Sequence, residues 1–469
     1  MSGPYTADRL NGRRVVLDRS DRDGAALAVA LAARGADVVL ADPDPAVDAP
    51  PGCRLEPDPL RAVERADLLM ADCWTGETAA HVVRARDRGI SVASLADLVL
   101  HEAPCPVVGV TGTAGKTMTT RLIADLVAAV GLAVHVPPTG RAENAWPSAD
   151  TLALLADGPV PDLIVLELTS THLAYVSTSP RHAVVTTLWP DHVELHGGEG
   201  RYIAAKQRIL SRQPVDGTAV LPLGETRIAA KPGVRATRFS GAAPVPGGVG
   251  VRDGVLEDAT GDAVRALADL ERLPLAPYLW GNVAAALACV CSSLLLDVHP
   301  GGALGAFAQP AWRGEEIARI RGTAVLHNGM AATPAKATAF LHGVRDGSTT
   351  LILGGLVASS AGEVHASAAE QRMLRDACAE AARAAGRAVL VGPAAARLAP
   401  LLAAAGLDRV DVGPDLHWAV GEALRDCGTA EAIAWVPMYP VALADREAFT
   451  DLVWAAARGA GLALEVGSR

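Results

Sequence analysis

The stretch that most constrains this chain is residues 106–117, which read PVVGVTGTAGKT. β-Branched residues precede the glycines, and beyond Lys116 apolar residues recur at helical spacing as far as Gly131. This pattern predicts a buried strand, a glycine-bearing loop and an amphipathic helix. Such a turn gathers backbone N–H groups and a helix N-terminus around one point, an arrangement that suits a polyphosphate.

The end of the loop carries two side chains that fit the same ligand. Lys116 adds a positive charge for the β- and γ-phosphates of ATP, and the Thr117 hydroxyl can ligate Mg²⁺. Val110 stands where the general P-loop pattern has its first glycine, so a tight βα turn without a nucleotide is the alternative. We assign to the nucleotide Gly112, Thr113, Gly115, Lys116 and Thr117.

Length and composition limit the classes of protein to consider. At 469 residues and 50% apolar content, the chain is long enough for about three domains. A net charge of −10 disfavours a nonspecific nucleic-acid binder. The sequence has no N-terminal signal pattern and no apolar run of membrane-spanning length. Its seven scattered cysteines fit reduced cytosolic thiols, so we expect a cytoplasmic protein without a membrane partner.

Both flanking segments read as α/β units. Over residues 1–102 short apolar strands alternate with helices, which predicts a small Rossmann-like domain with a parallel sheet. Its first loop, residues 18–24, has one glycine and three aspartates in place of a glycine fingerprint. That loop is either a solvated loop or an altered site. Residues 311–469 predict a second Rossmann-like unit, with strands at 323–327, 349–354, 387–392, 409–412 and 432–436.

The central segment, residues 103–310, holds the other candidate site residues. Glu167 ends the apolar run 162–168, at the edge where parallel sheets bind ligands, and is a candidate for Mg²⁺ unless it is an ordinary strand-end carboxylate. An Asp191–His192 pair follows another apparent strand and could serve a metal. Lys206 lies on an apparent helix, where a lone lysine is usually solvated.

Taken in order, the motifs T-G-T-x-G-K-T, E-L-[ST]-S, D-H-x-x-x-H-G and Y-x-x-A-K-x-R-I resemble those of the Mur ligase family. The branch that adds D-glutamate is the most similar. The resemblance implies three α/β domains: an acceptor-substrate domain at 1–102, a central P-loop ATPase domain with a mostly parallel sheet at 103–310, and an amino-acid-binding domain at 311–469. It implies an ADP-forming ligase that joins a carboxylic acid to an amino acid or amine through an acyl-phosphate.

The same resemblance implies roles for single residues. Lys116 would hold ATP phosphates, and Thr117, Glu167 and His192 would hold magnesium. Lys206 would become an N-carboxylated (carbamylated) lysine and thereby a further magnesium ligand. Asn282 would contact adenine, Arg313 would reach the ATP across a domain gap, and Asn328 and Thr333 are retained from a C-terminal motif.

Other positions depart from the family pattern. Gly329 and Ala331 replace an acidic residue and a lysine, and Ala444 replaces a serine expected to bind the amino-acid carboxylate. Three hypotheses follow. The chain is a ligase of this type diverted to another acceptor acid, in specialised metabolism for example; or it is the D-glutamate-adding enzyme of peptidoglycan synthesis; or it is a non-catalytic nucleotide-binding scaffold.

Overall fold

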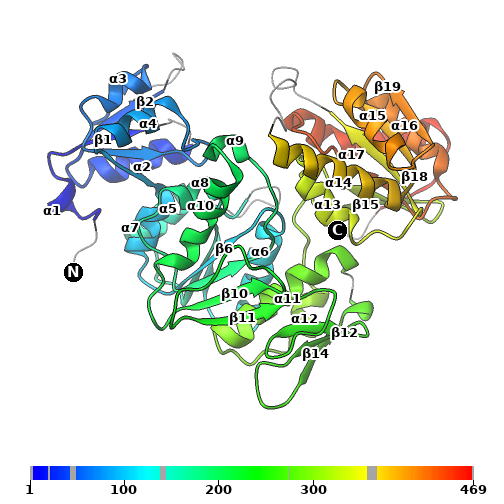
Figure 1. Cartoon of the computed structure of the whole chain (residues 1–469), viewed down its shortest axis with the longest axis horizontal. Coiled ribbons are helices and arrows are strands. Elements are labelled where there is room, and N and C mark those ends of the chain that lie inside the picture. The colour runs from blue at the N-terminus through cyan, green and yellow to red at the C-terminus, as the bar shows by residue number, and fades with distance from the viewer. Residues whose placement is uncertain are drawn as a thin grey trace. The chain divides into compact units, whose positions relative to one another are not determined.

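The computed structural model describes residues 4–18, 22–42, 49–137, 144–273, 275–355 and 367–466. The chain forms two compact units. The first comprises Met1–Leu188, His192–Pro274 and Gly281–Ala306, and the second comprises Trp189–Asp191, Leu275–Trp280 and Phe307–Arg469. The first unit contains two sheets and the second contains one (Figure 1).

The first sheet has five parallel strands in the order β3-β2-β1-β4-β5. Its strands are β1 (Arg14–Leu17), β2 (Asp37–Ala41), β3 (Arg54–Glu56), β4 (Leu68–Ala71) and β5 (Ser91–Ser94). The helices of this part are α1 (Ala7–Leu10), α2 (Arg22–Ala32), α3 (Pro59–Val63), α4 (Ala80–Asp87) and α5 (Leu95–Glu102). Buried apolar residues fill the central strands, as helices on both faces of a parallel sheet require. The predicted α/β architecture is confirmed here.

The second sheet has nine strands in the order β14-β13-β12-β11-β10-β9-β6-β8-β7. Its parallel part comprises β6 (Val107–Thr111), β7 (Val134–His135), β8 (Leu163–Glu167), β9 (His182–Val185), β10 (Thr218–Pro222), β11 (Arg235–Phe239) and β12 (Val249–Arg252). Two antiparallel strands, β13 (Val255–Asp258) and β14 (Arg265–Asp269), extend it. Arg252 pairs with Val255, so β12 and β13 form a hairpin around Asp253-Gly254.

The helices that surround this sheet carry the predicted motifs. They are α6 (Lys116–Ala128), α7 (Ala149–Asp157), α8 (Ser170–Ala174), α9 (Val193–His196), α10 (Glu199–Ser211), α11 (Trp280–Ala288) and α12 (Pro300–Gly305). Helix α6 buries one face that includes Leu122, Ile123 and Val127, which explains the apolar spacing in this part of the sequence.

The third sheet has seven strands in the order β19-β18-β17-β20-β16-β15-β21. Its strands are β15 (Glu315–Ile320), β16 (Thr323–His327), β17 (Thr349–Gly354), β18 (Ala385–Val391), β19 (Val410–Gly413), β20 (Ala432–Trp435) and β21 (Leu464–Val466). The five predicted strands are present, and β15 pairs antiparallel with both β16 and β21. The helices are α13 (Pro334–Leu341), α14 (Ala368–Ala384), α15 (Ala395–Ala404), α16 (Leu416–Ala423) and α17 (Leu443–Gly459).

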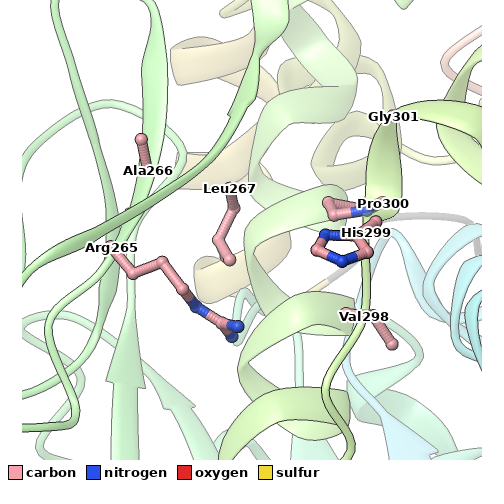
Figure 2. Close-up of a pocket in the computed structure, with 7 residues that line it drawn as sticks. All are labelled: Arg265, Ala266, Leu267, Val298, His299, Pro300 and Gly301. Carbon is pink, nitrogen blue, oxygen red and sulfur yellow. The ribbon is translucent and has the colours of Figure 1, made fainter.

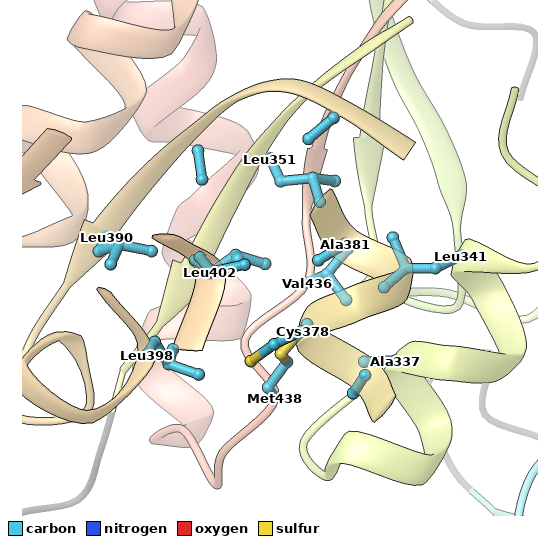
Figure 3. Close-up of a cluster of buried hydrophobic side chains, with 14 of the residues drawn as sticks. Ala337, Leu341, Leu351, Cys378, Ala381, Leu390, Leu398, Leu402, Val436 and Met438 are labelled. Atoms are coloured by element: carbon cyan, nitrogen blue, oxygen red, sulfur yellow. The ribbon is translucent and has the colours of Figure 1, made fainter. Parts of the chain in front are cut away.

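Small side chains allow the helices of the second unit to pack closely on its sheet. Helix α14 buries Ala377, Cys378 and Ala381 against Leu351 and Leu390 (Figure 3). This alanine-rich packing accounts for the composition of the segment without a functional explanation. None of the helices in the described ranges is long and apolar enough to cross a membrane.

The two sheets of the first unit share buried contacts. Ser94 donates a hydrogen bond to the His172 carbonyl at 3.2 Å, and Tyr175 donates one to the Thr75 carbonyl at 2.9 Å. Residues 103–106 connect the end of α5 to the start of β6. The domain boundaries at 102 and 310 stay predictions.

Candidate nucleotide and metal site

The phosphate loop lies where β6 meets α6, in the parallel part of the nine-stranded sheet. β6 lies between β8 and β9, so the carboxyl ends of three parallel strands converge on the loop. Gly115 is the N-cap of α6 and has a φ of +85°, which favours glycine. A Cβ on Gly112 would overlap Thr186 Oγ1, and one on Gly115 would overlap Asn282 Nδ2. Both glycines are therefore needed for this backbone path.

Hydroxyl groups from two neighbouring elements hold the loop in place. Thr186 Oγ1 donates to the Ala114 carbonyl at 2.5 Å, and Ala114 N donates to Thr187 Oγ1 at 2.9 Å. Thr113 Oγ1 lies 2.7 Å from the hydroxyl of Tyr202 on α10. The sequence analysis did not single out these partners. The signal it contained was the pair of threonines directly after β9, at the ligand-binding edge of the sheet.

Three predicted residues come together at the start of α6. Thr117 Oγ1 donates to Glu167 Oε2 at 2.5 Å, and Lys116 Nζ lies 3.8 Å from Glu167 Oε1. Lys116 also donates to the carbonyls of Gly112 and Thr113 at 3.1 and 3.3 Å. Glu167 is buried, so a hydroxyl, a carboxylate and an ammonium share a site of low solvent exposure. Charges interact more strongly there than in water.

Lys206 points to the same loop, and it is not the solvated helix lysine that its position alone would suggest. The residue is 2% exposed, and its Nζ donates to the Gly112 carbonyl at 2.8 Å and to Thr111 Oγ1 at 3.3 Å. The ammonium also lies 5.1 Å from the centre of the Tyr202 ring. Lys116 and Lys206 therefore share one carbonyl acceptor.

His192 occupies the N-cap of α9 with a left-handed backbone, φ +52° and ψ +35°. Its side chain is 38% exposed, and Nδ1 lies 3.9 Å from Glu194 Oε1. Its partner in the Asp–His motif, Asp191, lies in the second unit, 3.8 Å from the Lys336 ammonium. The role of His192 as a metal ligand stays a prediction.

The donor chemistry at the loop fits magnesium. In the described ranges, no three or more His, Cys, Asp or Glu side chains gather as a metal-binding group. The pair formed by Thr117 and Glu167 instead offers a hydroxyl and a carboxylate oxygen, and Mg²⁺ is typically held by one or two carboxylates together with substrate phosphates. Asn144 Oδ1 adds an amide oxygen 3.3 Å from Thr117 Oγ1.

The remaining predicted nucleotide residues lie in both units. In the first, the Asn282 amide donates to the Gly115 carbonyl and to Thr119 Oγ1, each at 3.1 Å, so it braces the loop. In the second, Arg313 donates to the Ala311 carbonyl at 3.0 Å. Asn328 and Thr333 are buried there, and Thr333 is the N-cap of α13. Their contacts with ATP stay predictions.

A group of aromatic residues that the sequence analysis missed adjoins the metal donors. Trp146, two residues after Asn144, makes edge contacts with Trp74 at 5.5 Å and with His172 at 5.9 Å between ring centres. Trp74 follows β4 of the five-stranded sheet and is 54% exposed. Burial lowers the pKa of His172 to about 4, so the ring stays neutral beside Glu167.

The three positions that depart from the family pattern, Gly329, Ala331 and Ala444, lie in the second unit and differ in burial. Ala331 is buried in the core cluster that includes Met438 and Tyr439. Gly329 follows β16, and its backbone N–H donates to His327 Nδ1 at 3.2 Å. Ala444 is exposed on the first turn of α17. The aspartate-containing loop at 18–24 falls partly outside the described residues, which exclude 19–21.

A separate cavity of about 220 Å³ lies between β14 and the segment before α12 (Figure 2). Its charged lining residue, Arg265, already pairs with Asp297 at 2.6 Å and with Asp258 at 3.6 Å. None of the predicted site residues lines this cavity.

Comparison with known proteins gives consistent matches. The family model for the Mur ligase middle domain matches residues 110–246. The chain is 32% identical over 372 residues to the UDP-N-acetylmuramoyl-L-alanine–L-glutamate ligase of Micromonospora sp., with 74% of this chain and 76% of the relative covered. It is 35% identical over 306 residues to the UDP-N-acetylmuramoylalanine–D-glutamate ligase of Phenylobacterium zucineum, with 59% and 62% covered.

A solved structure extends the likeness to the whole fold. The MurF ligase of Thermotoga maritima in complex with ADP superposes with a TM-score of 0.58 and covers 97% of each chain. Its sequence identity with this chain is 14%, so this likeness concerns the fold alone.

Proposed function

This chain belongs to the Mur ligase family of ATP-dependent, ADP-forming amide ligases, and on that premise we propose that it is a member diverted to an acceptor acid other than UDP-N-acetylmuramoyl-L-alanine. The amine it adds is an amino acid or a related amine. The observation that carries catalytic competence is the contact of Thr117 with Glu167 beside Lys116. We place the reaction in the cytoplasm, where ATP is available.

The first chemical step is phosphoryl transfer. An oxygen of the acceptor carboxylate attacks the γ-phosphorus of ATP, the bond to the ADP oxygen breaks, and an acyl-phosphate forms. Lys116 and the N–H groups at the start of α6 hold the phosphates, because both present positive charge to the same point. Thr117 and Glu167 would hold Mg²⁺, which offsets the charge that develops on the transferred group.

The second step is amide formation. The nitrogen of the incoming amine attacks the acyl carbon, a tetrahedral intermediate forms, and inorganic phosphate leaves as the amine gives up a proton. Lys116 and the N–H groups at the start of α6, which hold the phosphates in the first step, would also stabilise the departing phosphate in the second. The buried loop also limits hydrolysis of the acyl-phosphate by excluding water.

Lys206 enters the proposal as a carbamate. Its neutral amine would attack CO₂, forming an N–C bond and releasing one proton, and the product would be an anionic side chain. The ammonium groups of Lys116 and Lys206 both donate to the Gly112 carbonyl and therefore lie close together. A carbamate on Lys206 would replace one of these two like charges with an anion.

The contact between Trp74 and Trp146 is a candidate surface for the acceptor acid. It lies where the five-stranded and nine-stranded sheets meet, and Asn144 connects it to the Thr117 hydroxyl. A half-exposed indole offers flat apolar surface against which part of an acceptor can pack. The loop at residues 18–24 lacks the glycine fingerprint of a diphosphate site, and its three aspartates would repel phosphate, although Arg19 and Arg22 would offset part of that charge.

The specific alternative is the peptidoglycan enzyme itself, adding glutamate to UDP-N-acetylmuramoyl-L-alanine. The names of the relatives from Micromonospora sp. and Phenylobacterium zucineum favour it. Incubation with ATP, Mg²⁺, this acceptor and either D- or L-glutamate decides between the two. We expect little ADP from this mixture and ATP-dependent condensation with another acid in a mass-spectrometric screen. Efficient product formation from the muramoyl acceptor would refute the diverted-acceptor proposal.

A non-catalytic scaffold is the third hypothesis, motivated by the altered positions in the second unit. It predicts that Lys116→Ala leaves the biological activity intact. Phosphate release that requires both a carboxylate and an amine would eliminate it.

A further inference from the structure

An arginine of the second unit lies at the carboxyl edge of the seven-stranded sheet. Arg446 is on the first turn of α17, and its backbone carbonyl lies 2.8 Å from Nε2 of His327, the last residue of β16. Gly329, two residues after His327, packs against the arginine stem. A Cβ on Gly329 would lie 3.3 Å from Arg446 Cγ and 2.8 Å from His327 Cε1. Glycine at this position therefore leaves the space that the arginine stem needs.

The guanidinium of Arg446 has weak partners. Nη1 donates to the Met330 thioether at 3.5 Å, and Nη2 donates to the Val441 carbonyl at 3.3 Å. Nε is buried and has no hydrogen-bond partner among the described residues. No carboxylate of the described ranges forms an ion pair with this side chain, although Asp445 and Glu447 adjoin it in sequence and are exposed.

The surrounding groups do not compensate the charge. The ring facing the arginine backbone, His327, is neutral because burial lowers its pKa to about 4. Burial also lowers the pKa of Arg446 itself, which reflects the cost of removing the guanidinium from water. A partly buried cation without a counter-charge is unfavourable in the free protein. It becomes favourable when a carboxylate supplies two oxygens to the planar fork.

We propose that Arg446 binds a carboxylate of the incoming amine substrate, so that this substrate is an amino acid and not a simple amine. The proposal rests on the proposed function and deepens it. In the same unit Ala444 replaces the family serine expected to bind this carboxylate, and Ala331, which lies in the core, replaces a family lysine. Arg446 supplies from α17 the positive charge that Ala331 lacks.

The test uses the full chain and measures the thermal unfolding midpoint with D-glutamate, L-glutamate or their diamides, each in the presence and absence of ATP and Mg²⁺. The wild type should be stabilised by at least one glutamate and not by the diamides. Arg446→Met should keep or raise the midpoint of the ligand-free protein, retain the ATP-induced rise, and lose the glutamate-induced rise. Arg446→Lys should recover it in part, because a lysine cannot donate a bidentate pair. Arg425→Met, at a 72% exposed side chain of the same unit, is the matched control and should behave as wild type.

Kinetics provide the second readout. With an acid that supports ADP formation, Arg446→Met should raise the KM for the amino acid about ten- to a hundredfold, the range expected when a hydrogen bond to a charged group is lost. The ATP affinity should not change. An equal glutamate response in wild type and Arg446→Met, or no response in the wild type, would overturn the proposal. Absence of the ATP-induced rise in the wild type would instead refute the proposed function.

Discussion

Replacing Gly115 with alanine tests the geometry of the phosphate loop. The φ of +85° costs an alanine about 1 kcal/mol. The new Cβ also displaces the Asn282 amide, which then loses its two 3.1 Å hydrogen bonds to Gly115 and Thr119. At about 1 kcal/mol for each hydrogen bond, Gly115→Ala should lower the free energy of unfolding by about 3 kcal/mol in total.

Gly131 is the matched control. It has nearly the same φ, +87°, but a Cβ there would have nothing within 4 Å. Gly131→Ala should therefore show only the backbone cost of about 1 kcal/mol and should bind ATP as the wild type does. The difference of about 2 kcal/mol between the two variants measures the contact with Asn282.

A double-mutant cycle separates the two contributions further. Asn282→Ala alone should cost about 2 kcal/mol, and adding Gly115→Ala should bring the total to about 3 instead of the additive 5 kcal/mol. Urea unfolding measures the free energies of unfolding, and isothermal titration calorimetry measures the affinity for ATP. This affinity should fall in Gly115→Ala and stay at the wild-type value in Gly131→Ala. Equal stability and equal ATP affinity of these two variants would refute the loop geometry.

Further predictions concern the site and its surroundings. Lys206→Ala should abolish turnover, with partial rescue by added bicarbonate, and ¹³CO₂ should give the wild type a carbamate signal in NMR; full turnover of the variant would exclude the carbamate. The His172 pKa falls from 6.5 in the unfolded chain to about 4 in the folded protein. Protons therefore bind preferentially to the unfolded chain. The contribution of His172 to the free energy of unfolding is fully present above pH 6.5, and it should decrease by up to about 3 kcal/mol as the pH falls to 4. His172→Gln, which keeps an acceptor for the Thr169 N–H, should flatten this dependence, and an unchanged pH profile would contradict it. Trp146→Ala should weaken binding of the acceptor acid and leave ATP affinity unchanged; an equal loss of both would assign Trp146 to folding alone.

The sequence predicted the elements whose burial leaves a direct mark on composition. Runs such as 349–354 and 323–327 coincide with β17 and β16, because strands covered on both faces are mostly apolar. The loop at 112–115 was predictable because its conformation needs glycine. By contrast, β15 at Glu315–Ile320 was missed, since this antiparallel strand is charged at its start and only half of it is buried.

The candidate site was predictable in part. Thr117, Glu167 and Lys206 were found because each belongs to a motif, and the structure brings all three to the loop. Trp146, His172 and Arg446 were missed, because their importance comes from neighbours distant in sequence. Trp146 meets Trp74 from another sheet, and Arg446 meets Gly329 from another strand end. Local sequence patterns do not predict such contacts between residues that are distant in the chain.

Oxygen-isotope transfer tests the central claim most directly. The protein is incubated with ATP, Mg²⁺, a mixture of amino acids and a pool of acids labelled with ¹⁸O in their carboxylates, the muramoyl acceptor included. Because the acyl-phosphate gives one carboxylate oxygen to phosphate, the account predicts ADP together with inorganic phosphate that carries one ¹⁸O atom, and it predicts that Lys116→Ala produces neither. Unlabelled phosphate, formation of AMP, or no nucleotide turnover with any acid would contradict it.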